Sequence, residues 1–177
     1  MTANLSFKMG WRHVTYYQDR SAVSFAIEPM IVGADIVYFP SENSWSNAVP
    51  DWIKNDRDKV YGYLKSIKWN RELVWQDSDK ASCREIKNNS EPIIPGSLES
   101  TPGGKSLEEK RFFHPGSDIT FEQARKLWIE FDKRFSRQVR GVVTIFCDND
   151  LVPNSVFEQV ELPILKENPN VTLDFRN

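Results

Sequence analysis

The sequence has little cysteine and no long hydrophobic run. Its 177 residues include two cysteines, Cys83 and Cys147, which is too few for a disulfide framework or an all-cysteine zinc site. It contains no stretch of about 18 apolar residues, the length that a membrane-spanning helix needs. The first residues also lack the long apolar segment of a signal peptide. We therefore expect a cytoplasmic protein that contacts no membrane and binds no metal.

Positive charge is not in excess either. Lysine and arginine number 23 against 25 aspartates and glutamates, which gives a net charge of −2. Proteins that bind nucleic acid through its phosphates normally carry a basic excess, so we expect no direct nucleic-acid binding. The residues from Gly103 to Ser106 read GGKS, but Glu99 stands where the first glycine of a phosphate-binding loop would lie. The sequence therefore predicts no nucleotide site and no cofactor.

The N-terminal part of the chain has the pattern of a β-hairpin followed by further strands and a helix. Aromatic and polar residues alternate after residue 11, and turn-type residues at 18–21 separate them from a second run, Ala22–Ile27. Ile36–Phe39 and Glu72–Trp75 are two more short strand-type runs. Between them a helix is predicted from about Pro50, and its apolar face would carry Ile53, Val60, Leu64 and Ile67.

An amphipathic helix is predicted from about Phe121 to Phe135. Thr120 and Gln123 fit a capping box, in which the two side chains cover backbone amides at the start of a helix. Apolar residues then recur at spacings of three and four, which is typical of a helix that packs on a sheet. The residues expected at that contact are Leu127, Trp128, Phe131 and Phe135.

The last 40 residues or so predict a strand, a helix and a second strand. Val142–Phe146 is nearly all apolar, as in a strand that is covered on both faces. Ser155 and Glu158 offer a second capping box, and Pro163 is expected to kink or shorten the helix that follows. Val171–Phe175 is the final strand. Strand, helix and strand in this order predict a parallel pair with a right-handed crossover.

Taken together, these patterns predict a single α/β domain over residues 1–177. It would hold a mixed sheet with an N-terminal antiparallel hairpin and a C-terminal β-α-β unit, and its helices would pack on the sheet. Residues 78–118 are rich in Ser, Pro, Gly and charge and show little periodicity, so they predict a flexible loop. Two explanations stay open for this loop, a mobile surface excursion and a segment that becomes ordered on a partner.

Candidate catalytic residues are few. The two histidines, His13 and His114, would suit an acid-base mechanism in which one removes a proton and the other supplies one. Their spacing gives no sign that they meet, so a packed strand residue and a turn residue are the simpler interpretations. Cys147 follows an apolar strand and has no histidine near it in the sequence, which favours a small buried residue over a nucleophile. The sequence therefore predicts a protein that is not an enzyme, with a small histidine-dependent nuclease or nucleotide hydrolase as the alternative.

Acidic and aromatic residues instead suggest a binding surface. The stretch between Gly141 and Leu165 contains acids but neither lysine nor arginine, and an acidic face would suit a basic partner. Tryptophans in polar surroundings are favoured as binding anchors because they bury a large area at a low cost in entropy. The residues predicted to bind a partner are Asp148, Asp150, Glu158, Glu161, Trp45 and Trp52.

Residues 34–77 also resemble a known class of protein. The similar stretches are ADIVYF at Ala34–Phe39, PDW at Pro50–Trp52 and WNRELVW at Trp69–Trp75, together with Trp45 and the pair Asp56-Arg57. They are similar to small immunity proteins that are encoded beside bacterial contact-dependent growth inhibition systems and other polymorphic toxins. The resemblance implies a cytoplasmic protein that binds one cognate toxin domain, often a nuclease, and blocks its active site or substrate surface. It implies no particular contact residues, because the folds of such proteins vary.

Overall fold

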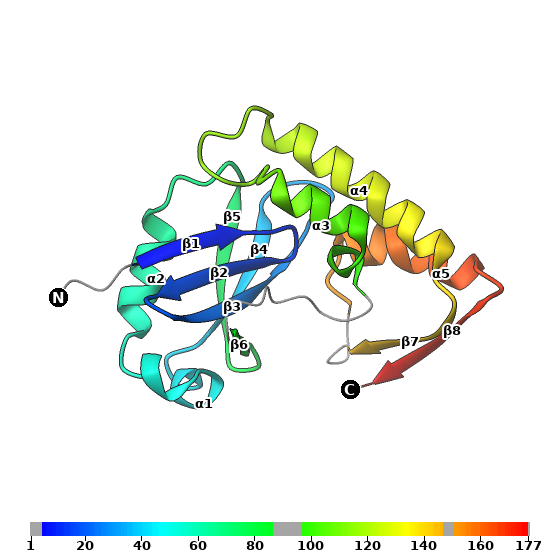
Figure 1. Cartoon of the computed structure of the whole chain (residues 1–177). Helices are drawn as coiled ribbons and strands as arrows, with labels where there is room; N and C mark the ends of the chain where they lie inside the picture. The colour runs from blue at the N-terminus through cyan, green and yellow to red at the C-terminus, as the bar shows by residue number, and fades with distance from the viewer. Residues whose placement is uncertain (1–4, 87–96, 147–150, 177) are drawn as a thin grey trace.

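The computed structural model describes residues 5–86, 97–146 and 151–176, which form a mixed α/β fold (Figure 1). Its strands are β1 (Leu5–Met9), β2 (His13–Gln18), β3 (Ser21–Glu28), β4 (Asp35–Pro40), β5 (Leu73–Ser78), β6 (Cys83–Ile86), β7 (Gly141–Phe146) and β8 (Val171–Arg176). Its longer helices are α1 (Trp45–Ala48), α2 (Arg57–Ser66), α3 (Pro102–Glu109), α4 (Phe121–Gln138) and α5 (Leu162–Glu167). Short helical turns are η1 (Asp51–Ile53), η2 (Leu98–Ser100) and the π-helical η3 (Phe157–Glu161).

The main sheet has six strands, five of them in the order β1-β2-β3-β4-β5. The predicted hairpin is confirmed, since β2 and β3 pair antiparallel and Asp19 in the turn has a φ of 54°. One edge of β3 lies along β2. The other edge pairs with β6 over Ala22–Phe25 and then with β4 at Ile27 and Glu28. The strands β4 and β5 run parallel, so the sheet is mixed as the sequence predicts.

The C-terminal strands are parallel, as predicted, but they do not belong to the main sheet. β7 and β8 form a sheet of their own and lie apart from the other strands, beyond α4 and α5 (Figure 1). The prediction that they supply the parallel strands of the one sheet is wrong. That place is taken by β4 and β5, whose crossover through α2 is long enough for a parallel connection. Val142 is 68% exposed, so β7 is not covered on both faces.

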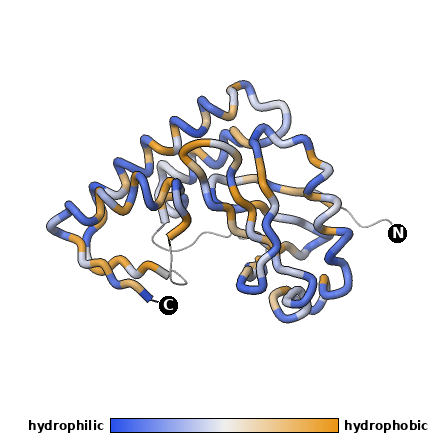
Figure 2. Tube along the Cα trace, turned by 180° about the vertical axis from the view of Figure 1, so that it is seen from behind, coloured by the Kyte–Doolittle hydropathy of each residue, from blue (hydrophilic) through white to orange (hydrophobic). Residues whose placement is uncertain are grey.

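The core lies between the main sheet and the helices on its two sides (Figure 1). Hydrophobic residues gather along the strands of the main sheet and alternate with hydrophilic ones along α4 (Figure 2). Val60 and Leu64 of α2 are fully buried, as the spacing in the sequence predicts. Trp11, which follows β1, is stacked between Phe113 and Trp128 with ring centroids 5.6 and 5.7 Å away. This aromatic stack ties α4 to the start of the hairpin.

Helix α4 begins with the predicted capping box: the amide of Gln123 donates to Thr120 Oγ1 and the amide of Thr120 donates to Gln123 Oε1. Its buried face agrees with the predicted one only in part: Trp128 is buried as predicted. Leu127 is 42% exposed, and Phe131 and Phe135 are half-buried. The buried side chains follow a spacing close to four and include three polar ones: Ala124, Arg125, Trp128, Asp132 and Ser136.

The segment 78–118 is predicted as a flexible loop, but its described residues include regular structure. It holds β6, η2 and α3, while residues 87–96 lie outside the described residues. Thr101 caps α3 by accepting a hydrogen bond of 3.0 Å from the amide of Gly104, and Pro102 follows at the first helical position. Gly104 is essential to this turn because a Cβ there would lie 2.1 Å from the carbonyl oxygen of Leu98. The Ser-, Pro- and Gly-rich composition of the segment thus predicts a loop, although Thr101 and Pro102 are typical of the start of a helix.

The helix between β7 and β8 shows how Pro163 is accommodated. The amide of Leu162 donates to the carbonyl of Phe157, five residues back, so the helix opens into a π-turn before the proline. A proline ring clashes with the carbonyl four residues earlier in an α-helix, and the wider turn gives it room. At the start of this helix Ser155 Oγ accepts from the amide of Glu158, as the predicted capping box requires, while the carboxylate of Glu158 accepts from Asn154 rather than from Ser155.

Candidate functional site

Trp45 and Trp52 do not form the exposed anchor that the sequence predicts. Trp45 is only 3% exposed and stacks on Phe25 and Phe39, and its indole nitrogen donates to the carbonyl of Ile53. Trp52 is half-buried against the same core. Trp45 opens α1 and Trp52 lies in η1, and both side chains pack on the core while polar neighbours such as Asp51 are exposed. Their role is therefore packing.

The predicted acidic surface is also different in the structure. Glu158 accepts a hydrogen bond of 2.7 Å from the amide of Asn154, which places it at the start of a helix. Glu161 forms an ion pair of 2.6 Å with Arg12, and its side chain is 13% exposed. Asp148 and Asp150 lie outside the described residues. Of the four acids, the two that are described make contacts within the chain.

The two histidines line different cavities. His13 borders a pocket between the hairpin and η2, whereas His114 borders a hollow formed with Phe7 and Lys110. His114 Nε2 accepts a hydrogen bond of 3.1 Å from the amide of Met9, and the ring stacks on Phe7. Burial and the neighbouring Arg111 lower the pKa of His114 to about 4. His114 is therefore a neutral structural residue near pH 7.

Cysteine offers no activated nucleophile in the described part of the chain. Burial raises the pKa of the Cys83 thiol to about 11, and its sulfur donates to the carbonyl of Ala48. A reactive thiol requires the opposite shift, toward the thiolate. Cys147 lies outside the described residues.

Four acids instead gather around one arginine in the interior. We call Arg12, Glu28, Glu99, Asp132 and Glu161 the Arg12 cluster. Arg12 Nη2 lies 2.6 Å from Glu161 Oε1 and 3.8 Å from Asp132 Oδ2. Burial lowers the pKa of Arg12 and the four carboxylates, Glu161 foremost, raise it, with a net upward change. The cluster joins the turn before β2, the end of β3, η2, α4 and η3.

The Arg12 cluster contains four acids and one cation, and two of the acids have raised pKa values. Burial and the negative charge of Glu161 raise the pKa of Asp132 well above its ordinary value. Burial likewise raises the pKa of Glu28. Asp132 Oδ2 accepts a hydrogen bond of 2.9 Å from the indole nitrogen of Trp11, which holds the carboxyl group in place. A raised pKa is the expected response of carboxyl groups that lie close together in the interior.

A second buried ion group fixes the turn that carries Arg12. Asp35 is fully buried; its Oδ2 accepts from Arg71 at 2.7 Å, and its Oδ1 lies 3.5 Å from Arg125 Nη2. Arg71 also donates to the carbonyl of Gly10 at 2.7 Å, and its guanidinium lies over the ring of Phe113. A Cβ on Gly10 would lie 2.4 Å from a ring atom of His13, so a larger residue there would displace this side chain. These contacts set the positions of Arg12 and His13.

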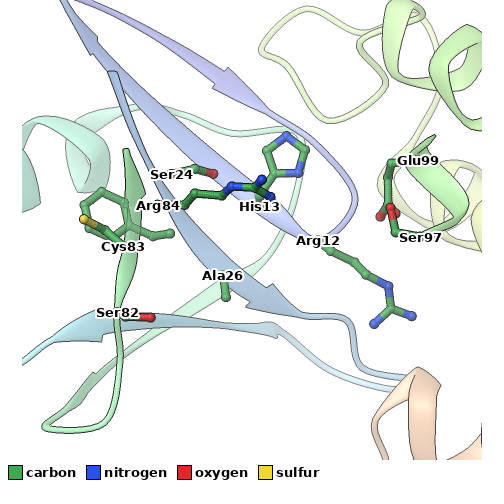
Figure 3. A pocket seen from close by; sticks show the side chains of 10 residues that line it. Arg12, His13, Ser24, Ala26, Ser82, Cys83, Arg84, Ser97 and Glu99 are labelled. Carbon is green, nitrogen blue, oxygen red and sulfur yellow. The ribbon is translucent and has the colours of Figure 1, made fainter. Parts of the chain in front are cut away.

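A pocket of about 250 Å³ opens beside the Arg12 cluster (Figure 3). Its walls come from β2, β3, the approach to β6, and η2. Polar and charged side chains alternate there with the apolar surfaces of Phe25, Ala26 and Cys83. The polar lining residues are Arg12, His13, Ser24, Ser82, Arg84, Ser97 and Glu99.

Oε1 of Glu99 and Oγ of Ser97 line this pocket, and both are buried without a hydrogen bond among the described residues. Glu99 is only 6% exposed, and Figure 3 shows both side chains on the same wall. The tight approach of Gly104 to the backbone of η2 holds this wall against α3. Most buried polar atoms in proteins have a hydrogen-bond partner, so two that line one pocket make it a candidate binding site.

Sequence reasoning missed Glu99, Ser97 and Asp132. Asp132 had a readable signal, because it lies four residues after Trp128 and four before Ser136 on the buried stripe of α4. Glu99 had none, since it stands in a Ser-, Pro- and Gly-rich stretch that carries no periodicity.

Comparison of the chain with known proteins adds no relative to this picture. In the described part of the chain, no group of three or more His, Cys, Asp or Glu side chains is placed to hold a metal ion. No helix within residues 5–86, 97–146 and 151–176 is both long and apolar enough to cross a bilayer. Comparisons with models of protein families, with curated proteins and with solved structures find no match.

Proposed function

We propose that this chain is an immunity protein of the cytoplasm, which binds a cognate toxin domain and neutralises it. The toxin would be a nuclease, and inhibition would come from occlusion of its active site or substrate surface. The observation that carries the proposal is the pocket at Glu99, where a buried carboxylate oxygen has no hydrogen-bond donor among the described residues. A protein partner with a basic surface would supply that donor.

The chemistry of the described side chains supports binding over catalysis. His13 and His114 line separate cavities, so they are not placed to act as base and acid on one substrate. His114 uses its Nε2 to accept from the backbone, and the Cys83 thiol has a raised pKa. His114 and Cys83 thus stabilise the fold, whereas Glu99 in the pocket keeps a carboxylate oxygen without a hydrogen bond among the described residues.

The resemblance to immunity proteins supports the same proposal from another part of the chain. Residues 34–77 form β4, α1, η1, α2 and β5, the parallel unit at one side of the main sheet. Its tryptophans serve the core, since Trp45 and Trp75 both pack on Phe39. The resemblance therefore concerns the framework, while contact with a toxin would involve other residues.

Electrostatics suggests how neutralisation would work. A nuclease presents cationic side chains where the phosphates of its substrate bind. Acidic groups of this chain would lie where those phosphates lie, and the complementary charge would raise the rate of association. Such an interaction is weakened by salt, so the association rate should fall as ionic strength rises.

Co-expression with the protein encoded immediately upstream tests the proposal. That neighbour should stop growth when it is expressed alone and should be harmless when this chain is present. As a control, a destabilised variant of this chain such as Asp35→Asn should protect less. The proposal fails if the neighbour is harmless by itself, or if it remains toxic in the presence of the folded wild-type chain.

A further inference from the structure

We propose that the pocket beside the Arg12 cluster receives a single basic side chain of the partner, an arginine, with Glu99 as its counter-ion. This inference rests on the proposed function, because it names the group of the toxin that enters the site. Four features carry it: the burial of Glu99, the engagement of Arg12, the size of the pocket and the character of its walls.

Glu99 is a buried acidic residue with an oxygen that is unpaired among the described residues. The residue is 6% exposed, and its Oε1 has no hydrogen-bond partner in that part of the chain. Removing a carboxylate from water without a hydrogen bond or a cation is costly, and a protein normally avoids it. A guanidinium group of the partner would donate hydrogen bonds to this oxygen and offset that cost. The side chain of Glu99 in the free protein is therefore placed to bind a cation.

The nearest cation of the chain is already engaged. Arg12 points its Nη2 at Glu161, 2.6 Å away, and has Asp132 at 3.8 Å. It also feels the charges of Glu28 and Glu99, so a single arginine serves four acids. Because the guanidinium of Arg12 is hydrogen-bonded to Glu161, Oε1 of Glu99 stays without a hydrogen bond among the described residues and is open to a second guanidinium.

The size of the pocket fits one side chain. Its volume of about 250 Å³ is below the range of roughly 300–1,000 Å³ that drug-sized ligands occupy. Ala26, which is exposed on β3, offers apolar surface for a hydrocarbon stem. Ser97 Oγ is buried beside Glu99 and is free to accept an N–H bond within the described structure. An arginine has both the stem and several donors in a fixed planar arrangement, which lysine lacks.

The other charged residues at the pocket set the orientation of the guest. Arg84 lies on β6 and His13 on β2, across the opening from Glu99 on η2 (Figure 3). A guanidinium is attracted to the wall with Glu99 and repelled by Arg84. The guanidinium end of the partner's arginine therefore binds at η2, next to Ser97.

The first experiment uses the free chain and a small probe. N-acetyl-arginine amide is titrated into the protein while the backbone amide signals are followed by NMR. The control probe is the corresponding citrulline amide, which has nearly the same shape and no charge. The arginine probe should give saturable shifts at Ala26, Ser97 and Glu99, and the citrulline probe should give none. Shifts that do not saturate, or that are equal for the two probes, would overturn the inference.

Variants of the chain then assign the effect to one carboxylate. Glu99→Gln keeps the shape of the side chain and removes its charge, and should weaken binding of the arginine probe about tenfold or more. Glu109→Gln, on the exposed side of α3, is the matched control and should leave the affinity unchanged. Both variants should keep the wild-type dispersion of amide signals. Equal affinities of wild type and folded Glu99→Gln would contradict the role of Glu99.

The same variants separate this inference from the proposed function. Glu99→Gln should weaken binding to the upstream-encoded toxin by about tenfold or more, chiefly through faster dissociation. If the variant and the wild type bind the toxin equally well, the function stands and the pocket is not the site. If the wild type does not bind the toxin but binds the arginine probe through Glu99, the pocket stands and the proposed function fails.

Discussion

Arg12 and Glu161 are 149 positions apart in the sequence, and their side chains form an ion pair of 2.6 Å. The pair joins the turn between β1 and β2 to the π-helical segment near the C-terminus. Asp132 of α4 lies on the same guanidinium and also receives the indole N–H of Trp11. The N-terminal hairpin, α4 and the C-terminal helix are thus held together by one cation.

Replacing Arg12 by methionine should therefore destabilise the whole fold. Glu161 and Asp132 would lose their cation while remaining largely buried, a change that costs about 3–5 kcal/mol for fully buried pairs. We expect a loss of about 3 kcal/mol, because a quarter of the Arg12 side chain is exposed. Urea unfolding measures this change. The control Arg176→Met removes an exposed pair with Asp174 and should change the free energy of unfolding by less than about 0.5 kcal/mol. Equal losses in the two variants would show that Arg12 does not hold these elements together.

The second ion group allows a matched pair of aspartate substitutions. Asp35→Asn removes the charge between Arg71 and Arg125, which are buried, and should lower the free energy of unfolding by about 3–5 kcal/mol. Asp77→Asn removes a charge at 2.9 Å from Arg57 on the surface and should cost less than about 1 kcal/mol. Chemical denaturation of both variants gives the comparison. A cost for Asp35→Asn no larger than that for Asp77→Asn would contradict the buried pairing.

Neighbouring residues of α4 test which face of the helix packs. Trp128 is 1% exposed and lies against Trp11, so Trp128→Ala should cost about 3–5 kcal/mol. Leu127 is 42% exposed, and Leu127→Ala should cost less than about 1 kcal/mol. Thermal unfolding of the two variants should therefore give very different midpoints. A larger loss for Leu127→Ala than for Trp128→Ala would contradict the buried face seen in the structure.

His114 should make stability depend on pH on the acid side. Burial lowers its pKa from the ordinary 6.5 to about 4, so the unfolded chain binds the proton more readily than the folded chain between these values. The free energy of unfolding should therefore fall as the pH falls from 6.5 toward 4. Protonation would also break the bond from the amide of Met9 to Nε2.

A variant isolates this histidine from the buried acids. Asp132 and Glu28 have raised pKa values, so their contribution to stability is lost as the pH rises and has the opposite sign. His114→Gln keeps an acceptor for the amide of Met9 and removes the titration. Urea unfolding at several pH values should give a smaller acid-side loss in this variant than in the wild type. An identical acid-side slope would mean that His114 is not the group responsible.

Much of the fold could be predicted because its signals are local. The hairpin follows from alternation and a turn at 18–21, and the start of α4 follows from Thr120 and Gln123. The separation of β7 and β8 from the main sheet could not be predicted in this way. Local patterns do not show which distant strands will pair. In the main sheet the parallel pair is β4 and β5.

The candidate site was largely beyond prediction for the same reason. Arg12 meets partners at positions 28, 99, 132 and 161, and no spacing in the sequence links these positions. Residues that look like surface residues in the sequence can also be buried in the fold. Trp45 and Glu161 resemble surface anchors in their polar local sequence, yet one packs on Phe39 and the other pairs with Arg12. Asp132 is the exception, since a polar residue on the four-residue stripe of α4 predicts a buried polar contact.

The central claim is that this chain neutralises a toxin by binding it. The most direct measurement titrates the purified upstream-encoded domain with this chain and follows the cleavage of nucleic acid by that domain. We predict that cleavage falls in proportion to the added chain and stops at equimolar amounts, with weaker inhibition by Glu99→Gln than by Glu109→Gln. Full cleavage in the presence of an excess of the folded wild-type chain would contradict the account.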